Sequence, residues 1–128
     1  MFIQNQFEDY IIYKEKSIKN ALDKIDFNKS GFLIVVNKQL KVVGILTDGD
    51  FRRWLIKSKD KDLNQSIINA ANKKFIYKTY NSRNKDLTEI FRNDIKFLPL
   101  LDKDLKLKGI AFKNRFNFII DKFEIKKN

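Results

Sequence analysis

The sequence predicts an α+β fold that contains two copies of one βαββα unit, and three observations support this prediction. Short apolar runs come in pairs separated by polar turns, as in β-hairpins. Helical patterns flank each pair. The second half of the chain repeats the first at a constant spacing of 65 residues, as between Gly44 and Gly109. Because one unit has too little sheet area to stand alone, we expect a pseudo-two-fold pair with its sheets packed together.

The first unit, residues 1–65, is predicted to begin with an irregular lead-in that contains a short strand at 10–13. A helix follows Ser17, a residue type that is favoured at N-caps. Behind Ser17, apolar residues have the i, i+3, i+4, i+7 spacing of a helix that packs one face on a core. These residues are Ile18, Ala21, Leu22 and Ile25.

A β-hairpin and a second helix complete the first unit. The run 32–36 is rich in β-branched residues and too short for a buried helix, which predicts a buried strand. A polar turn then leads to a return strand at 41–46. The pattern after this strand predicts a helix over about 48–57.

The second unit, residues 66–128, repeats these elements. Its helix begins after Ser82, where the repeat places a second N-cap. Its predicted elements, in order, are a short helix at 62–71 that crosses the unit boundary, a strand at 75–77, the helix after Ser82, strands at 97–101 and 105–111, and a last helix at about 113–123.

The composition excludes several kinds of site. The 128 residues include no cysteine and no histidine, which excludes a disulfide framework, a thiolate zinc site and a histidine general base. No apolar run reaches the roughly 18 residues of a membrane span, and Met1–Glu8 lack the pattern of a signal peptide. We therefore expect a cytoplasmic protein that has no membrane partner and requires no cofactor.

The net charge of +11 raises the question of a nucleic-acid partner. The lysines, however, are spread over almost every predicted loop, and no cluster of arginine and aromatic residues of the base-stacking kind stands out. Scattered lysines are typical of a solvated surface. The sequence therefore predicts no nucleic-acid partner.

One stretch, residues 44–53, carries most of the chemistry of the chain. It runs from a predicted strand through a polar turn into a helix, and such a helix start offers unpaired backbone N–H groups to an anion. A carboxylate can accept the hydroxyls of a ribose, and a guanidinium can bind a phosphate with two hydrogen bonds. The stretch therefore suggests a nucleotide pocket, and its polar side chains are Thr47, Asp48, Asp50, Arg52 and Arg53.

A simpler interpretation of the same residues is a capped helix. Thr47 and Asp50 have the spacing of a capping box, although Glu or Gln is the usual third residue, and Asp-Gly is an ordinary turn pair. The internal repeat favours the ligand site, because it places two such returns equivalently around a pseudo-two-fold cleft.

The order of these elements resembles a tandem pair of CBS domains, also called a Bateman module, over about residues 10–123. The resemblance rests on the strand Gly31–Val36, on the return Gly44–Asp50 with its Gly-h-x-Thr-x-x-Asp pattern, and on the second copy. It implies two βαββα units with packed sheets, a homodimer, and clefts between the units that bind AMP, ADP or ATP.

The resemblance also implies roles for single residues. Thr47 would contact the ribose or phosphate region, and Asp50 would bind the ribose hydroxyls. The chemistry of the stretch adds Arg52 and Arg53 as phosphate ligands. The alternative is that at least one of these arginines is a solvated helix residue.

Two further segments belong to the predicted site through the resemblance alone. Ser30, Gly31 and Phe32, just before and at the first strand, would border the base. Ser17 and Ile18, at the entry to the first helix, lie where the family often places another lining residue.

The second copy departs from the pattern. Phe112 stands where the first copy has Thr47, and Arg115 stands where it has Asp50. A phenylalanine side chain makes no hydrogen bond, and an arginine cannot accept one from a ribose hydroxyl. We therefore expect one competent site per chain, the second being inactive or altered to bind a more acidic ligand through Lys113 and Arg115.

The sequence Thr47–Arg53 is similar to CBS pairs of two kinds, those fused ahead of sugar-nucleotide nucleotidyltransferases and those behind sugar-phosphate isomerases. This similarity implies a regulatory module that senses an adenine nucleotide and modulates such a fused or partner enzyme, with the nucleotidyltransferase preferred. The alternative is a structural dimerisation domain with a degenerate nucleotide site; aromatic residues such as Trp54 fit packing in a core or at a dimer interface. The best candidates for an enzyme active site are Asp48 and Asp50, as ligands of Mg²⁺ for phosphoryl transfer. We expect no enzyme, because the sequence has no Walker-type loop to hold the phosphates.

Overall fold

The computed structural model describes residues 2–82, 91 and 95–113, which form a mixed α+β structure with one three-stranded and one four-stranded sheet. This result confirms the predicted fold class. The chain divides into two compact units, which we call the N-terminal unit (residues 9–75) and the split unit (residues 1–8 with 76–128). The helices predicted after Ser82 and at 113–123 lie outside the described residues.

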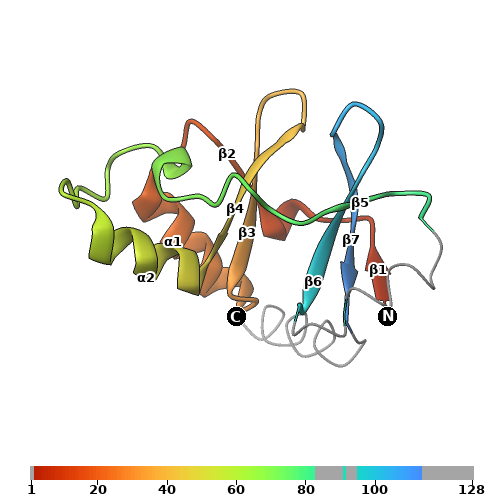
Figure 1. Ribbon diagram of the computed structural model, residues 1–128, viewed down its shortest axis with the longest axis horizontal. Helices are drawn as coiled ribbons and strands as arrows, with labels where there is room; N and C mark the ends of the chain where they lie inside the picture. The colour runs from red at the N-terminus through yellow and green to blue at the C-terminus, as the bar shows by residue number, and fades with distance from the viewer. Residues whose placement is uncertain (1, 83–90, 92–94, 114–128) are drawn as a thin grey trace. The chain divides into compact units, whose positions relative to one another are not determined.

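The N-terminal unit is a three-stranded sheet with two helices on one face (Figure 1). The strand order is β2-β3-β4, with β2 parallel and β4 antiparallel to β3. Its elements are the 3-10 helix η1 (Glu8–Tyr10), β2 (Ile11–Tyr13), α1 (Ile18–Asn28), β3 (Phe32–Val36), β4 (Val42–Thr47), α2 (Asp48–Lys57) and the 3-10 helix η2 (Ile67–Asn69).

The core of this unit lies between the sheet and the helices. All five residues of β3 are buried, as the sequence predicts for the run 32–36. Leu33, Val35 and Leu46 face the helices and pack with Ile18 and Ala21 of α1. Burial of such side chains contributes roughly 1.5–3 kcal/mol each, so this cluster fixes the position of both helices on the sheet.

The first helix begins after Ser17, where the sequence predicts. The Ser17 hydroxyl accepts a hydrogen bond from Asn20 N at 3.1 Å, and Asn20 Oδ1 accepts one from Ser17 N at 3.2 Å. At its other end the fully buried Asn28 donates through Nδ2 to the carbonyls of Asp9 and Phe32, at 2.9 and 3.3 Å. Asn28 therefore ties the end of α1 to the start of β3.

The split unit is a four-stranded sheet in the order β1-β7-β6-β5. Its strands are β1 (Phe2–Gln4), β5 (Lys78–Thr79), β6 (Phe97–Leu101) and β7 (Leu107–Phe112). The prediction that the whole lead-in before residue 10 is irregular was wrong for Phe2–Gln4, which pair antiparallel with β7. This pairing joins residues about 110 positions apart, and no local pattern in the sequence indicates it.

The internal repeat is visible in the details of both hairpins. A bulge lies between Val35 and Val36 in one and between Leu100 and Leu101 in the other. The turns contain a leucine with positive φ, 63° at Leu40 and 65° at Leu105. In both hairpins an Asx side chain accepts two backbone N–H bonds across the turn, Asn37 in one and Asp102 in the other.

The short helix predicted at 62–71 was wrong in extent, since only the 3-10 turn η2 forms there. Its backbone groups are used elsewhere. Gln65 O accepts from Ile18 N at 3.0 Å, and Ile67 N donates to Lys16 O at 2.8 Å. Because each residue has a single backbone N–H, the Ile67 N–H that binds Lys16 O is not available to an α-helix of its own segment. The strand predicted at 75–77 is likewise displaced to β5 (Lys78–Thr79).

The compact units do not coincide with the sequence repeat, which places a boundary between residues 65 and 66. Compactness divides the chain after residues 8 and 75, and the boundary at 65 stays a prediction. Neither α1 nor α2, the α-helices of the described residues, has the length and apolar character that a membrane crossing requires.

Candidate functional site

The candidate site is built on the junction of β4 and α2. Thr47 is the N-cap of α2 in an extended conformation, and its Oγ1 accepts from Asp50 N at 3.1 Å. Asp50 Oδ2 in turn accepts from Thr47 N at 3.0 Å and from Thr47 Oγ1 at 2.9 Å. The capping-box interpretation is therefore confirmed for these two residues. A capping role does not exclude a ligand, because only one carboxylate oxygen is fully used.

The second carboxylate oxygen of Asp50 is paired with an arginine. Arg53 Nη2 donates to Asp50 Oδ1 at 2.8 Å, one helical turn further along α2. The Asp50 side chain is only 12% exposed, whereas that of Arg53 is 56% exposed. The pair therefore joins a largely buried acceptor to a donor whose side chain is more than half exposed.

Two predicted residues from the start of β3 lie beside this junction. Phe32 pairs with Thr47 in the β3–β4 register, and Asp48 N donates to Gly31 O at 3.2 Å. Gly31 has a φ of 80°, and a Cβ at this position would lie 3.3 Å from Asp48 Oδ2. Glycine is suited to this place because it adopts positive φ at little cost and leaves space for the carboxylate.

Ser30 completes this end of the sheet, and Asn28 holds it. Asn28 Oδ1 accepts from Ser30 N at 2.9 Å and from Ser30 Oγ at 2.7 Å. The buried ring of Phe32 stacks on Tyr10 with centroids 5.4 Å apart. Of the three predicted base-bordering residues, Ser30 and Gly31 are therefore half-buried beside the junction, whereas the Phe32 side chain is part of the core.

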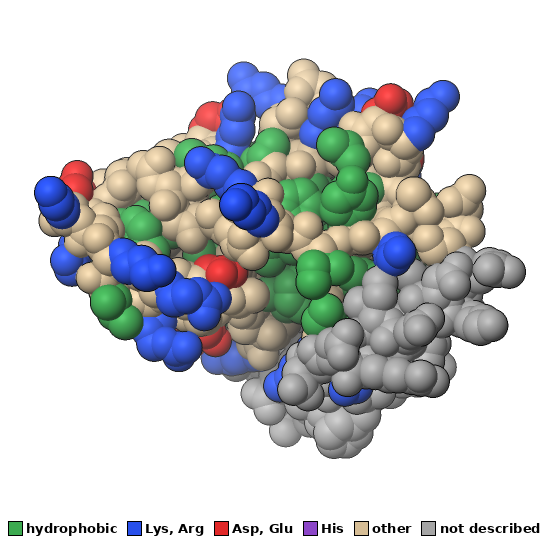
Figure 2. All heavy atoms as spheres, in the orientation of Figure 1, with side chains coloured by type: hydrophobic (Ala, Val, Ile, Leu, Met, Phe, Trp, Pro, Cys, Tyr) green, Lys and Arg blue, Asp and Glu red, His purple; other side chains and the backbone are tan. Residues whose placement is uncertain are grey.

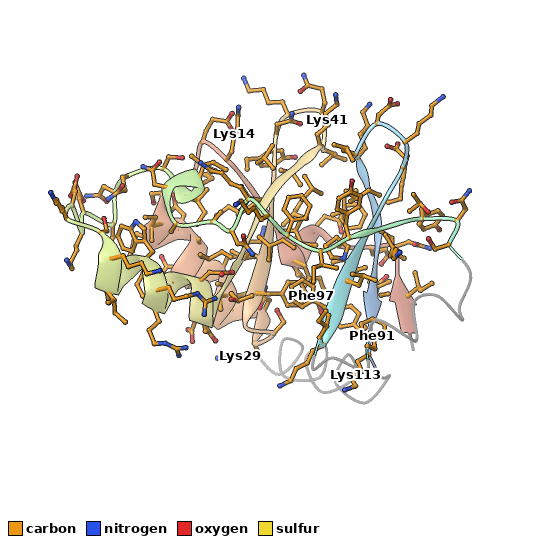
Figure 3. The ribbon with its side chains drawn as sticks, viewed as in Figure 1. Lys14, Lys29, Lys41, Phe91, Phe97 and Lys113 are labelled. Atoms are coloured by element: carbon orange, nitrogen blue, oxygen red, sulfur yellow. The ribbon has the colours of Figure 1, made fainter. Side chains whose placement is uncertain are left out.

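The other predicted residues are not brought to this junction. Ser17 and Ile18 lie at the opposite end of α1 from Ser30, about 16 Å along an 11-residue helix. Figure 3 shows Lys14 at one end of this sheet and Lys29 at the other. The Ile18 side chain is fully buried, and Ile18 N donates to Gln65 O. Arg52 is exposed on α2 and has no hydrogen bond or ion pair with the described residues.

A groove of about 630 Å³ runs along α2, and we call it the α2 groove. Asp50 and Arg53 line one part of it, and Lys57 adds a second cation in the last turn of α2. Figure 2 shows Lys and Arg side chains gathered over this side of the molecule. The complete lining is Asp50, Arg53, Trp54, Lys57, Ser58, Gln65, Asn69, Ala70, Ala71 and Asn72.

The segment 65–72 is the part of the groove that sequence reasoning missed. Asn72 forms an antiparallel bridge with Ile45, with Ile45 N donating to Asn72 O at 3.0 Å and Asn72 N donating to Ile45 O at 2.7 Å. A Cβ at Gly44 would lie 3.0 Å from the Ala71 Cβ. A glycine within a strand often marks a place where another segment approaches closely, so Gly44 is the residue in the sequence that could have indicated this contact.

The equivalent junction in the split unit has the same backbone and different side chains. Lys113 N donates to Lys96 O at 2.8 Å, as Asp48 N donates to Gly31 O. Phe112, at the position of Thr47, is buried. Arg115, which replaces Asp50 in the sequence, lies outside the described residues. Among the residues that the structure describes, no cluster of acidic side chains is arranged to hold a metal ion.

The segment that contains this junction is similar to a known family. Residues 8–57 match the CBS domain. The match includes Thr47, Asp50 and Arg53 and ends before the second repeat. No curated protein is significantly similar to the chain as a whole.

Solved structures of CBS-domain proteins have the same fold. CBSX2 in complex with AMP is 21% identical, with a TM-score of 0.73, and the alignment covers 98% of this chain and 95% of that one. The CBS domain protein NE2398 is 25% identical, with a TM-score of 0.67 and coverages of 89% and 87%. The protein ATU1752 from Agrobacterium tumefaciens is 22% identical, with a TM-score of 0.66 and coverages of 88%. The shared fold therefore extends over both repeats.

Proposed function

We propose that this chain is a regulatory module that binds an adenine nucleotide, AMP, ADP or ATP, at the start of α2. The observation that carries the proposal is the hydrogen-bonded pair of Thr47 and Asp50 within the segment that matches the CBS domain, with Asp50 lining the α2 groove. CBSX2, which shares the fold, has been solved in complex with AMP. We further propose that the chain itself catalyses no reaction.

In this proposal, the ribose lies against Asp50 and Thr47. A carboxylate oxygen accepts hydroxyl hydrogen bonds strongly, since a charged acceptor shortens and strengthens them. Ser30 and Gly31 lie on the same side of the sheet end, beside Asp48, and border the base. Arg53 faces the phosphate, and Arg52 is the solvated arginine that the sequence allowed for. Ser17 and Ile18 contribute to the site only if the ligand reaches the other end of α1.

We propose that the module modulates a fused or partner enzyme, a sugar-nucleotide nucleotidyltransferase before a sugar-phosphate isomerase. The support is the similarity of the sequence Thr47–Arg53 to the CBS pairs of those enzymes. Only a difference in nucleotide affinity between two conformations can drive such regulation. Co-purification of the chain with a nucleotidyltransferase, and a nucleotide-dependent change of its rate, would test this part.

The nucleotide proposal is tested by calorimetric titration with AMP, ADP and ATP. Asp50→Ala removes the ribose acceptor and the N3 residue of the α2 capping box. Asn20→Ala is the matched control, because Asn20 has the same capping position in α1. Each variant is expected to lose about 0.5–2 kcal/mol of helix capping. Only Asp50→Ala is expected to lose affinity, by about 1.5–3 kcal/mol for a charged hydrogen-bond partner.

Equal losses of nucleotide affinity in the two variants would show that capping, and not a direct contact, controls binding. Saturable binding to the parent protein that Asp50→Ala leaves unchanged would place the ligand elsewhere. No binding up to millimolar concentration would exclude adenine nucleotides and direct the search to sugar nucleotides.

A structural dimerisation domain is the second candidate, and exposed apolar side chains favour it. On α2, Ile56 is 73% exposed, and Leu55 lies beside it, also exposed; on α1, Phe27 is exposed as well. A homodimer would bury these side chains. Light scattering should give a dimer mass that Ile56→Asp reduces to a monomer mass. A dimer that binds no nucleotide would support this candidate over the sensor.

A further inference from the structure

We infer that Arg53 occupies the carboxylate of Asp50 in the ligand-free protein, and that a nucleotide binds by replacing Arg53 as the hydrogen-bond partner of Asp50. The ribose hydroxyls would donate to Asp50 in place of Arg53, and the released guanidinium would bind the phosphate. This inference rests on the proposed function and concerns the selectivity of the same site. It makes Arg53 the residue that distinguishes a nucleotide from a nucleoside.

The acceptor capacity of Asp50 is the first argument. A carboxylate offers about four lone-pair positions, two on each oxygen. Oδ2 is filled by the N–H and the hydroxyl of Thr47, at 3.0 and 2.9 Å. Oδ1 has one position left beside the bond from Arg53 Nη2 at 2.8 Å. A ribose has two neighbouring hydroxyl donors, so both can donate to Oδ1 only when Arg53 leaves.

The position of the guanidinium is the second argument. A Cβ built on Gly49 would lie 3.3 Å from both Nη atoms of Arg53. The guanidinium therefore lies back over the first turn of α2, in close contact with the position that a side chain at residue 49 would take. Gly49 leaves room for this position, and the pair depends on the folded-back Arg53 side chain.

The cost of opening the pair is low enough for a ligand to meet. The pair joins a largely buried Asp50 to an Arg53 side chain that is 56% exposed, and water can solvate the guanidinium when it leaves. The coupling energy is therefore near that of exposed ion pairs, about 0.2–1 kcal/mol, equivalent to a roughly 1.5- to five-fold change in affinity. A nucleoside must break the pair without compensation. A nucleotide offers the guanidinium a phosphate instead, with Lys57 as a second cation along the same groove. The exchange therefore favours phosphorylated ligands.

The test compares AMP with adenosine, which offers the same ribose without a phosphate. Arg53→Met keeps the aliphatic stem of the side chain and removes its donors and charge. Lys19→Ala is the control, because Lys19 forms an exposed pair with Asp23 at 2.7 Å on α1, and its loss changes the net charge equally. Calorimetry gives the affinities, and Trp54, the only tryptophan of the chain, lines the groove as a fluorescence reporter.

In Arg53→Met, AMP is expected to bind about ten-fold or more weakly, whereas adenosine is expected to bind about 1.5- to five-fold more tightly, because Arg53 no longer competes for Asp50. Lys19→Ala should leave both affinities unchanged. If AMP weakens and adenosine does not respond, Arg53 is a simple phosphate ligand and the exchange is overturned. If the parent protein binds neither adenosine nor any of AMP, ADP and ATP, the proposed function itself is overturned, and the exchange with it.

Discussion

The start of α2 and the end of β7 occupy equivalent positions in the two repeats and differ in the chemistry that they carry. In both places a return strand ends, at Thr47 in β4 and at Phe112 in β7. The residue after this end donates its N–H to a backbone carbonyl that lies just before the paired strand. The two distances are 3.2 Å for Asp48 N to Gly31 O and 2.8 Å for Lys113 N to Lys96 O.

The side chains at these junctions have opposite roles. Thr47 is half-buried and hydrogen-bonded to Asp50, while Phe112 is 2% exposed and belongs to the apolar interior. The backbone scaffold therefore persists whether or not a polar site stands on it. Strand pairing is satisfied by N–H and C=O groups that every residue carries, so a candidate site can be lost through two side chains without loss of the fold.

The largest expected effect that tests this comparison is on stability. Phe112→Ala should lower the free energy of unfolding by about 3–5 kcal/mol, because it opens a cavity in a packed interior. Thr47→Ala at the equivalent position should cost about 0.5–2 kcal/mol, the value of an N-cap. Urea denaturation of both variants measures the difference. Equal costs would mean that the two junctions do not differ in burial as described.

A smaller effect is expected at the two leucines with positive φ. The left-handed conformation costs a non-glycine residue about 1–2 kcal/mol. Glycine avoids this cost but loses more backbone entropy on folding, which offsets part of the stabilisation. Leu40→Gly and Leu105→Gly should therefore each stabilise the protein, by about 0.5 kcal/mol. Thermal melting of the single variants is the measurement. A stabilisation in one hairpin and a loss in the other would break the equivalence of the turns.

The smallest effect concerns pH. The N–H of Lys106 donates to the Asp102 carboxylate and lowers its pKa below the ordinary 3.8, partly offset by desolvation, and the N–H of Asp104 and the charges of Lys108 and Lys106 add to the lowering. A lowered pKa contributes stability above pH 3.8 that is lost as the pH falls through the folded-state value. Asn37 makes the equivalent turn with a neutral amide.

Asp102→Asn should therefore reduce the loss of stability as the pH falls below 3.8. Denaturation midpoints of the parent and the variant across this range test the expectation. An unchanged acid profile in Asp102→Asn would show that the turn carboxylate makes no contribution.

Local patterns in the sequence were sufficient for most of the strands and for both helices of the N-terminal unit. Ser17 and Thr47 cap the helices that they were expected to cap. The elements that the sequence did not predict depend on distant partners. Strand β1 forms because it pairs with the edge of β7. The segment around Gln65 forms no α-helix, because its backbone is hydrogen-bonded to the start of α1.

The candidate site was predictable in its centre and not in its surroundings. The spacing of Thr47 and Asp50 indicated their contact. Arg53, and not Arg52, pairs with Asp50 because residues three apart on a helix share a face and residues two apart do not, so this choice could have been made from the helical spacing. The groove wall at 65–72 depends on the bridge between Ile45 and Asn72, a contact that no periodicity marks.

The measurement that tests the central claim most directly is the stoichiometry of AMP binding to the purified chain by calorimetry. The account predicts saturation at about one AMP per chain, at the Asp50 junction, with none at the Phe112 junction, because the second junction lacks a hydroxyl and a carboxylate. Two equivalent sites per chain, or one site that survives Asp50→Ala, would contradict it.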